Sequence, residues 1–202
     1  MLGLKHPHEG TRQRAALALG PLVRPELAGR LAAHLWSEPD FFVRETLTWL
    51  LTRIPRQALA EALGALCDER SQVRHDAVHL IGKIADPSAV SAVLPLTADA
   101  DDAVAAKARF VLTRLGDPSA IPALTAYLGR GDDAQRTALT RDLASFGEAA
   151  LPHLHHALGH GAPRVREHAE WVLEVIREQQ DGTGEDSRLT LTRRQASRSE
   201  TC

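Results

Sequence analysis

An amphipathic segment recurs along this sequence at intervals of 30 to 32 residues. Aligning its six copies places five arginines and one alanine in a single column, here called the arginine column: Arg12, Arg44, Arg74, Ala105, Arg136 and Arg166. Seven residues further on, every copy has an apolar side chain: Leu19, Leu51, Ile81, Leu112, Leu143 and Leu173. Self-similarity at a fixed period of this length is typical of repeat proteins. The sequence therefore predicts a stack of similar units rather than a globule with one centre.

A second, shorter apolar stripe lies between successive copies. Its residues stand three or four positions apart, as one face of a helix requires. One such stripe consists of Leu59, Leu63 and Leu66. The dipeptides Asp86-Pro87 and Asp117-Pro118 precede two further stripes. Because Asp is a preferred N-cap and Pro is favoured at the first helical position, each period is expected to be a pair of helices.

The composition agrees with an all-α chain. Aromatic residues make up only 4% of the 202 residues, while the hydrophobic set reaches 44% and charged residues 25%. Ala and Leu, which are good helix formers, are abundant, and β-branched residues do not gather in alternating runs. We expect one repeat domain over residues 1–180. Residues 181–202 lose the apolar pattern and are expected to form a disordered polar tail.

Two stretches show the repeat most clearly, VRHDAVHLIGKIADPSAVSAVLPL (residues 73–96) and RFVLTRLGDPSAIPALTAYL (residues 109–128). They resemble HEAT repeats, specifically the short HEAT-like type first named from phycobilisome lyases. The resemblance implies an all-α fold, a right-handed α-solenoid or superhelix of about five to six HEAT-like helical hairpins of ~31 residues. The sequence departs from this pattern at Ala105, which replaces the usual arginine, and at Asp142, which stands in an otherwise apolar column.

The same resemblance places the helices of the arginine column on the concave side of the solenoid. At 100° per residue, the direction opposite the buried columns is occupied by the fifth residue after the arginine column. This fifth-position column reads Leu17, Trp49, His79, Phe110, Arg141 and Trp171. A basic edge beside it consists of Arg53, Lys83 and Arg114. Large aromatic side chains along an exposed face indicate a binding surface.

Two interpretations of the fifth-position column remain open. In the first, the groove binds a protein or peptide, with Trp49, Phe110 and Trp171 as anchors and His79 and Arg141 as polar contacts. In the second, tight curvature packs the aromatic side chains against one another, and the column belongs to the core. We expect a non-catalytic scaffold without a cofactor, because the sequence has no nucleophile elbow, P-loop, dinucleotide fingerprint or HExxH motif.

A metal-binding enzyme is one alternative. His75 and His79 stand four residues apart, and Glu45 occupies the position equivalent to His75 in the preceding unit, which would bring three ligands together. The segment RHDA also faintly resembles helices of deoxyhypusine hydroxylase, a HEAT-like di-iron enzyme. That family needs several His-Glu pairs in two halves, and only His75-Asp76 is comparable here. We therefore expect no metal.

DNA is the alternative partner. The segment FFVRETLTWLLTR looks similar to a groove helix of the HEAT-like alkylpurine DNA glycosylases, with Trp49 and Arg53 as the matching residue types. The tryptophan pair followed by aspartate of that family is missing. A formal net charge of −2 also provides no overall attraction for a polyanion.

Cysteine usage and hydropathy favour the cytoplasm. The two cysteines, Cys67 and Cys202, form neither a disulfide framework nor a CxxC motif. The opening segment MLGLKHPHEG lacks the apolar core of a signal peptide, and no run of about 18 apolar residues appears. We expect a protein that does not associate with a membrane.

Overall fold

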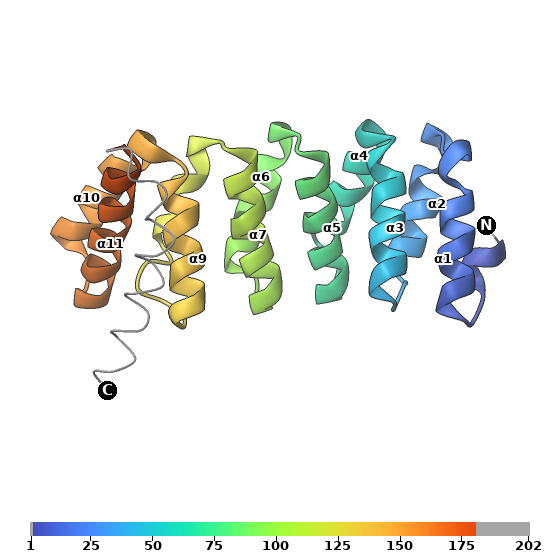
Figure 1. Cartoon of the computed structure of the whole chain (residues 1–202), viewed down its shortest axis with the longest axis horizontal. Coiled ribbons are helices and arrows are strands. Elements are labelled where there is room, and N and C mark those ends of the chain that lie inside the picture. Colours follow the sequence, from blue (N-terminus) through green and yellow to red (C-terminus); the bar gives the residue numbers. More distant parts are fainter. Residues whose placement is uncertain (1, 181–202) are drawn as a thin grey trace. The chain divides into compact units, whose positions relative to one another are not determined.

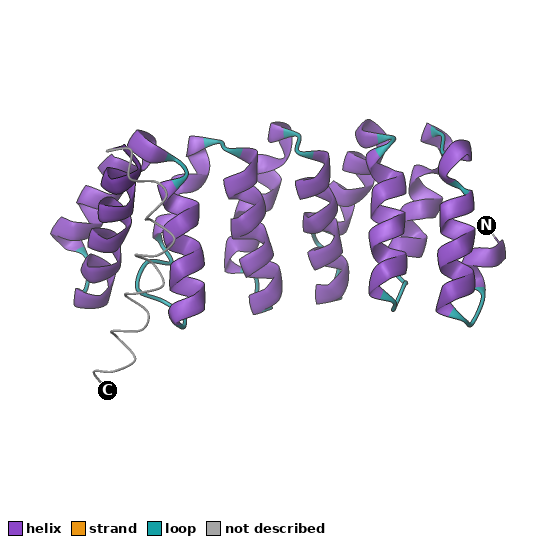
Figure 2. Ribbon diagram, in the orientation of Figure 1, coloured by secondary structure: helices purple, strands orange, loops and turns teal. Residues whose placement is uncertain are grey.

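The computed structural model describes residues 2–180, and every regular element in this range is helical (Figure 2). The all-α prediction is therefore confirmed. The chain divides into two compact units with the boundary between Leu115 and Gly116. Unit 1 ends at Leu115 and unit 2 begins at Gly116. The tail expected at residues 181–202 lies outside the described residues, and the single domain expected over residues 1–180 stays a prediction.

Unit 1 consists of helical hairpins whose helices form two layers (Figure 1). The first layer contains the helices of the arginine column: α1 (Glu9–Ala18), α3 (Phe41–Thr52), α5 (Ser71–Ile84) and α7 (Asp102–Leu115). The second layer contains α2 (Ala28–Leu35), α4 (Pro55–Ala65), α6 (Val90–Val93) and the 3-10 helix η5 (Leu94–Ala98). Shorter 3-10 helices are η1 (Leu2–Lys5), η2 (Gly20–Leu22), η3 (Pro25–Leu27) and η4 (Pro87–Ala89). Successive first-layer helices pack on one another and on their second-layer partners.

The core of unit 1 lies between the two layers. In α3, α5 and α7 the residues six and seven positions after the arginine column fill it, and these are at most 1% exposed: Leu50, Leu51, Leu80, Ile81, Val111 and Leu112. They meet the buried apolar stripe of the second layer, for example Leu31, Leu59 and Val93. Burying these side chains supplies the main free energy of association between the layers. The predicted helical pairing follows from this shared core.

The arginine column has a repeated structural role. The Nη1 atom of each arginine donates to carbonyl groups five or six residues before it, in the loop that leads into its own helix: Arg12 to His6 and Pro7, Arg44 to Glu38 and Pro39, Arg74 to Asp68 and Glu69, Arg136 to Gly131, and Arg166 to Gly161. These bonds satisfy loop carbonyls that have no helical partner. Where Ala105 interrupts the column, Arg109 Nη1 donates instead to the Thr97 carbonyl at 3.1 Å.

The arginines of unit 1 also connect one hairpin to the next, and Arg44 of α3 lies 3.6 Å from Asp76 of α5. Arg12 binds Glu38 through Nη2–Oε1 and Nε–Oε2 distances of 2.7 and 2.8 Å. Arg74 binds Asp99 in the same way, at 2.7 Å for each pair of atoms. Both carboxylates lie just before the next first-layer helix, and bidentate pairs of this kind fix geometry as well as charge.

Helix α5 and helix α7 approach each other closely at Gly82. A Cβ atom at this position would lie only 2.7 Å from Cγ2 of Val111. Gly82 lies inside α5, where glycine is intrinsically unfavourable. The glycine therefore permits the close packing of two neighbouring hairpins.

Unit 2 continues the series of paired helices. These are η6 (Pro118–Ala120), α8 (Ile121–Thr125), α9 (Asp133–Ala144), η7 (Gly147–Ala150), α10 (Leu151–His160) and α11 (Pro163–Gln180). Helix α11 packs on α9 and α10. The departure at Asp142 is accommodated inside α9, where this side chain is 9% exposed and its Oδ1 lies 4.0 Å from Arg141 Nε.

The N-caps expected at Asp86 and Asp117 are found. The carboxylates of Asp86 and Asp117 accept from the backbone N–H of Ser88 and Ser119. Asp40 caps α3, and Asp132 forms a capping box with Gln135 at α9. Each of these acceptors satisfies an N–H group that the helix itself leaves without a partner. The aspartates therefore determine where the helices begin.

Candidate functional site

The fifth-position column lies at the surface of unit 1. Leu17, Trp49 and Phe110 are 52%, 48% and 43% exposed, and His79 is half-buried between them along the sequence. These residues come from α1, α3, α5 and α7, the four helices of the first layer (Figure 1). We call Leu17, Trp49, His79 and Phe110 the aromatic face. It is the side of the first layer that points away from the core, as the periodicity predicts.

The side chain of Trp49 lies across the gap between α3 and the end of α1. Its Cη2 and Cζ3 atoms lie 3.4 and 3.5 Å from the position that a Cβ at Gly20 would occupy. The guanidinium of Arg53, one turn further along the chain, lies 5.2 Å from the centre of the indole. One side of the ring therefore packs on backbone while about half of its surface remains accessible. A ring held in place but partly exposed loses little entropy when it binds a partner.

Phe110 is flanked by cations on α7. Lys107 Nζ and Arg114 Cζ lie 5.8 and 5.9 Å from the centre of its ring. These positions stand three residues before and four residues after Phe110, which places them on the same helical face. Arg53 and Arg114, two residues of the expected basic edge, therefore lie against the aromatic rings. Lys107 belongs with them and was not expected.

A charged cluster connects α3, α5 and α7 between the two rings. His79 Nε2 lies 2.8 Å from Glu45 Oε1, and Lys83 Nζ lies 3.9 Å from Glu45 Oε2. Burial lowers the pKa of His79, an effect that Glu45 opposes and that Lys107 reinforces. Glu45 is the carboxylate that these contacts bring to the face, while the cations are Arg53, Lys83, Lys107 and Arg114. The aromatic face therefore carries an excess of positive charge.

In unit 2 the expected groove residues behave differently. Arg141 is exposed, as expected, but Trp171 is only 7% exposed. Its indole lies 5.7 Å from the ring of His168, one turn earlier in α11. His168 is itself held by the N–H of Gly129 at 3.0 Å and by a 2.9 Å contact with the Thr140 hydroxyl. The expected exposure of Trp171 is wrong, because its indole is buried beside the ring of His168.

The predicted ligands of a metal site do not converge. Glu45 and His79 meet, but the nearest charged partner of His75 is Asp76, with 3.5 Å between Nδ1 and Oδ1. Asp76 in turn lies 3.6 Å from Arg44, and Lys83 lies beside Glu45. Among residues 2–180 there is no group of three or more His, Cys, Asp or Glu side chains able to hold a metal ion. The three-ligand hypothesis is therefore wrong for Glu45, His75 and His79.

An exposed aromatic pair that the repeat pattern did not indicate lies at the start of α3. Phe41 and Phe42 are 59% and 70% exposed, and their rings meet edge to face at 5.5 Å. Phe42 stands seven residues before Trp49, two helical turns away on the same face. The seven-residue spacing between Phe42 and Trp49 in the sequence could have indicated that both lie on this face. The aromatic pair extends the apolar surface of α3 along the length of the helix.

Comparison with known proteins places the chain among helical repeat proteins. Residues 92–174 match the family model of HEAT repeats. No curated protein matches the sequence. No helix of the described part of the chain has the length and apolar character needed to cross a membrane.

Solved structures with similar folds include designed and natural repeat proteins. A designed armadillo repeat protein in complex with the peptide (KR)4 is 18% identical, with coverage of 86% of this chain and 96% of that chain and a TM-score of 0.47. Human deoxyhypusine hydroxylase is 20% identical, with coverages of 85% and 81% and a TM-score of 0.46. The complex of CpcE and CpcF of phycocyanin lyase from Nostoc sp. PCC7120 is 15% identical, with coverages of 87% and 92% and a TM-score of 0.37.

The period of the arginine column continues through α1, α3 and α5, before the residues that the family model matches. The same paired helices and the same loop-binding arginines appear there. The described chain is therefore an all-α helical repeat, and its residues 92–174 are similar to HEAT repeats.

Proposed function

We propose that this protein is a non-catalytic scaffold that binds a segment of a partner protein on the aromatic face of unit 1. The observation that carries the proposal is a series of contacts along the first layer of unit 1. Trp49 lies over Gly20 and beneath Arg53. Further along the layer, Glu45 contacts His79 and Lys83, and Lys107 flanks Phe110. Exposed aromatic side chains fixed on rigid helices are typical anchors of protein interfaces.

The charge of this face indicates the chemistry of the partner. Three cations lie against the two rings, a fourth, Lys83, pairs with Glu45, and Glu45 is the one carboxylate among these contacts. A partner segment with acidic side chains would neutralise the excess, while its apolar side chains would cover the indole and the phenyl ring. We therefore infer an acidic, partly apolar peptide segment as the preferred partner. Trp171 has no part in this surface, because it is buried in unit 2.

Titration with short synthetic peptides tests the proposal. The probes are a peptide of alternating leucine and glutamate, the same peptide with lysine in place of glutamate, and a single-stranded oligonucleotide. We expect the glutamate peptide to bind and the lysine peptide not to bind. Trp49→Ala should weaken binding about tenfold or more, since buried aromatic anchors contribute most of an interface's affinity.

Matched charge variants separate the aromatic face from the rest of the surface. The double substitution Arg53→Gln with Arg114→Gln should weaken binding of the glutamate peptide about fivefold. Arg24→Gln with Arg56→Gln removes the same charge from exposed positions outside the face and should leave the affinity unchanged. Equal binding of the two peptides, or no effect of Trp49→Ala, would contradict the proposal. Tight oligonucleotide binding that weakens steeply with salt would assign the face to nucleic acid instead.

A further inference from the structure

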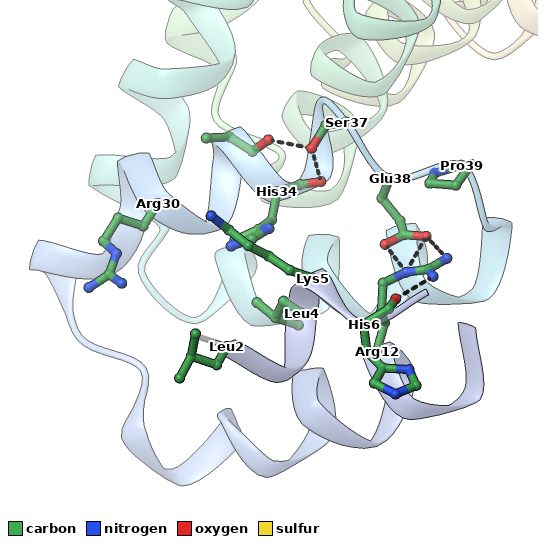
Figure 3. Close-up of a pocket in the computed structure, with 11 residues that line it drawn as sticks. Leu2, Leu4, Lys5, His6, Arg12, Arg30, His34, Ser37, Glu38 and Pro39 are labelled. Carbon is green, nitrogen blue, oxygen red and sulfur yellow. Dashed lines mark hydrogen bonds and ion pairs between the residues drawn. The ribbon is translucent and has the colours of Figure 1, made fainter. Parts of the chain in front are cut away.

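A cavity of about 650 Å³ lies at the beginning of unit 1, away from the residues of the aromatic face. It is bounded by η1, by α2, by Arg12 of α1 and by the loop from Ser37 to Pro39 (Figure 3). Its volume falls within the range of small-molecule sites, about 300–1,000 Å³. Leu2, Leu4, Ala33 and Pro39 contribute apolar surface, and Lys5, Arg30 and His34 contribute nitrogen atoms.

The one carboxylate in the lining is already neutralised. Glu38 receives hydrogen bonds from Arg12 Nη2 and Nε at 2.7 and 2.8 Å, and its Oε1 also accepts from the Asp40 N–H at 3.0 Å. Both carboxylate oxygens of Glu38 therefore already accept hydrogen bonds from Arg12, on one side of the cavity (Figure 3). Arg12 also donates to the carbonyls of His6 and Pro7, so this pair belongs to the structural framework.

Lys5 and Arg30 have no ion-pair partner among the described residues. Both side chains are exposed, and both act on the half-buried His34. Burial lowers the pKa of His34 and the positive charges of Lys5 and Arg30 lower it further, against a smaller opposing effect of Glu38. The potential inside the cavity is therefore positive. Like charges that share a site without a counterion repel one another, and an anion would relieve that repulsion.

We propose that this cavity binds a small amphiphilic anion, a carboxylate or a phosphate monoester that carries a short hydrocarbon chain. The anionic group is placed between Lys5 and Arg30, beside His34. The hydrocarbon chain lies against Leu2, Leu4 and Ala33. Arg12 and Glu38 form the wall and take no further charge, because each already satisfies the other. The site is separate from the peptide-binding face and does not depend on it.

Calorimetric titration of the full chain with defined probes tests this site. Hexyl phosphate and hexanoate combine both features, while inorganic phosphate has only the charge and 1-hexanol has only the chain. We expect the stronger of the two amphiphilic anions to bind about tenfold more tightly than either single-feature probe. Comparison of hexyl phosphate with hexanoate identifies the preferred anionic group. Raising the salt concentration should weaken binding of the amphiphilic anion, because the cations are partly exposed.

Substitutions of the two cavity cations provide a second test of the proposed site. Lys5→Gln with Arg30→Gln should reduce affinity for the better probe about tenfold, while Arg56→Gln, an exposed change on α4, should have no effect. Circular dichroism verifies that the double variant keeps its helices. No heat of binding with either amphiphilic anion, or 1-hexanol binding as tightly as these anions, overturns the proposal. Binding that is insensitive to both the double substitution and salt overturns it as well.

Discussion

Units 1 and 2 follow the same repeat but place its fifth-position column in different surroundings. In unit 1, Trp49 and Phe110 remain about half exposed above an apolar core. In unit 2, Trp171 occupies the equivalent position but is buried beside His168. The difference lies three residues before each ring: Thr46 and Lys107 in unit 1, but a buried imidazole in unit 2. The buried Trp171 therefore has an imidazole neighbour one turn earlier in its helix, which Trp49 and Phe110 lack.

The arginines of the arginine column also make different contacts in the two units. In unit 1, Arg12 and Arg74 bind carboxylates that precede the next first-layer helix, so ion pairs connect successive hairpins. In unit 2, Arg136 and Arg166 donate to glycine carbonyls within their own approach loops, and Arg136 also pairs with Asp133 of its own helix. The connection between α9 and α11 relies instead on the hydrogen bonds of His168. We expect the two units to respond differently to equivalent substitutions.

Replacing the two tryptophans should give the largest difference in stability between the two units. Trp171→Ala should lower the free energy of unfolding by about 3 kcal/mol, because it leaves a cavity in packed surroundings. Trp49→Ala should lower it by less than about 1 kcal/mol, since about half of that ring is already exposed. Urea unfolding followed by circular dichroism measures both. Equal losses for the two variants would mean that the column has the same environment in both units.

Removing the imidazole of His168 should have the next largest effect. His168→Ala leaves the Gly129 N–H and the Thr140 hydroxyl without this partner, which should cost about 2–3 kcal/mol. His153→Ala, an exposed change on α10, should stay within about 0.5 kcal/mol of the unsubstituted protein. The same urea titration checks both variants. A loss for His168→Ala as small as that for His153→Ala would show that unit 2 does not depend on the imidazole.

A pair of glycines tests the close packing within unit 1. Gly82→Ala should destabilise the protein by about 1–2 kcal/mol, because the new methyl group would meet Val111 at 2.7 Å. Gly64→Ala, inside α4 with no atom within 4 Å of the new group, should stabilise it by about 0.5–1 kcal/mol. Thermal unfolding of both variants distinguishes the signs. Stabilisation by Gly82→Ala would contradict the close contact between α5 and α7.

The smallest expected effect concerns pH. The side-chain hydrogen bonds from Arg74 hold the pKa of Asp99 below its ordinary value of 3.8. A depressed pKa in the folded state contributes stability above the unfolded value, and that contribution is lost as pH falls through the folded value. Asp99→Asn should therefore be less stable than the unsubstituted protein at pH 7, and the difference should shrink below about pH 4. A difference that stays constant down to pH 2 would exclude the ionised pair as its cause.

Much of the fold followed from local patterns. The recurring apolar positions predicted helical pairs, and Asp86 and Asp117 predicted where two of the helical segments begin. The surface location of Trp49 and Phe110 followed from the same periodicity. The exposed pair Phe41 and Phe42 escaped notice, because two adjacent aromatic residues at a helix start read equally well as core. The cavity near Lys5 escaped it as well, since η1 and α2 are brought together only by packing.

The amino-acid sequence by itself determined the period, the helical pairing and the side of each helix that faces the core, because these depend on residue spacing within one helix. Tertiary structure alone decided which arginines bind a neighbouring hairpin, which imidazole lies beside a buried tryptophan and which cations gather around a cavity. Those outcomes depend on distances between side chains of different helices, and residue spacing along one chain segment does not encode such distances.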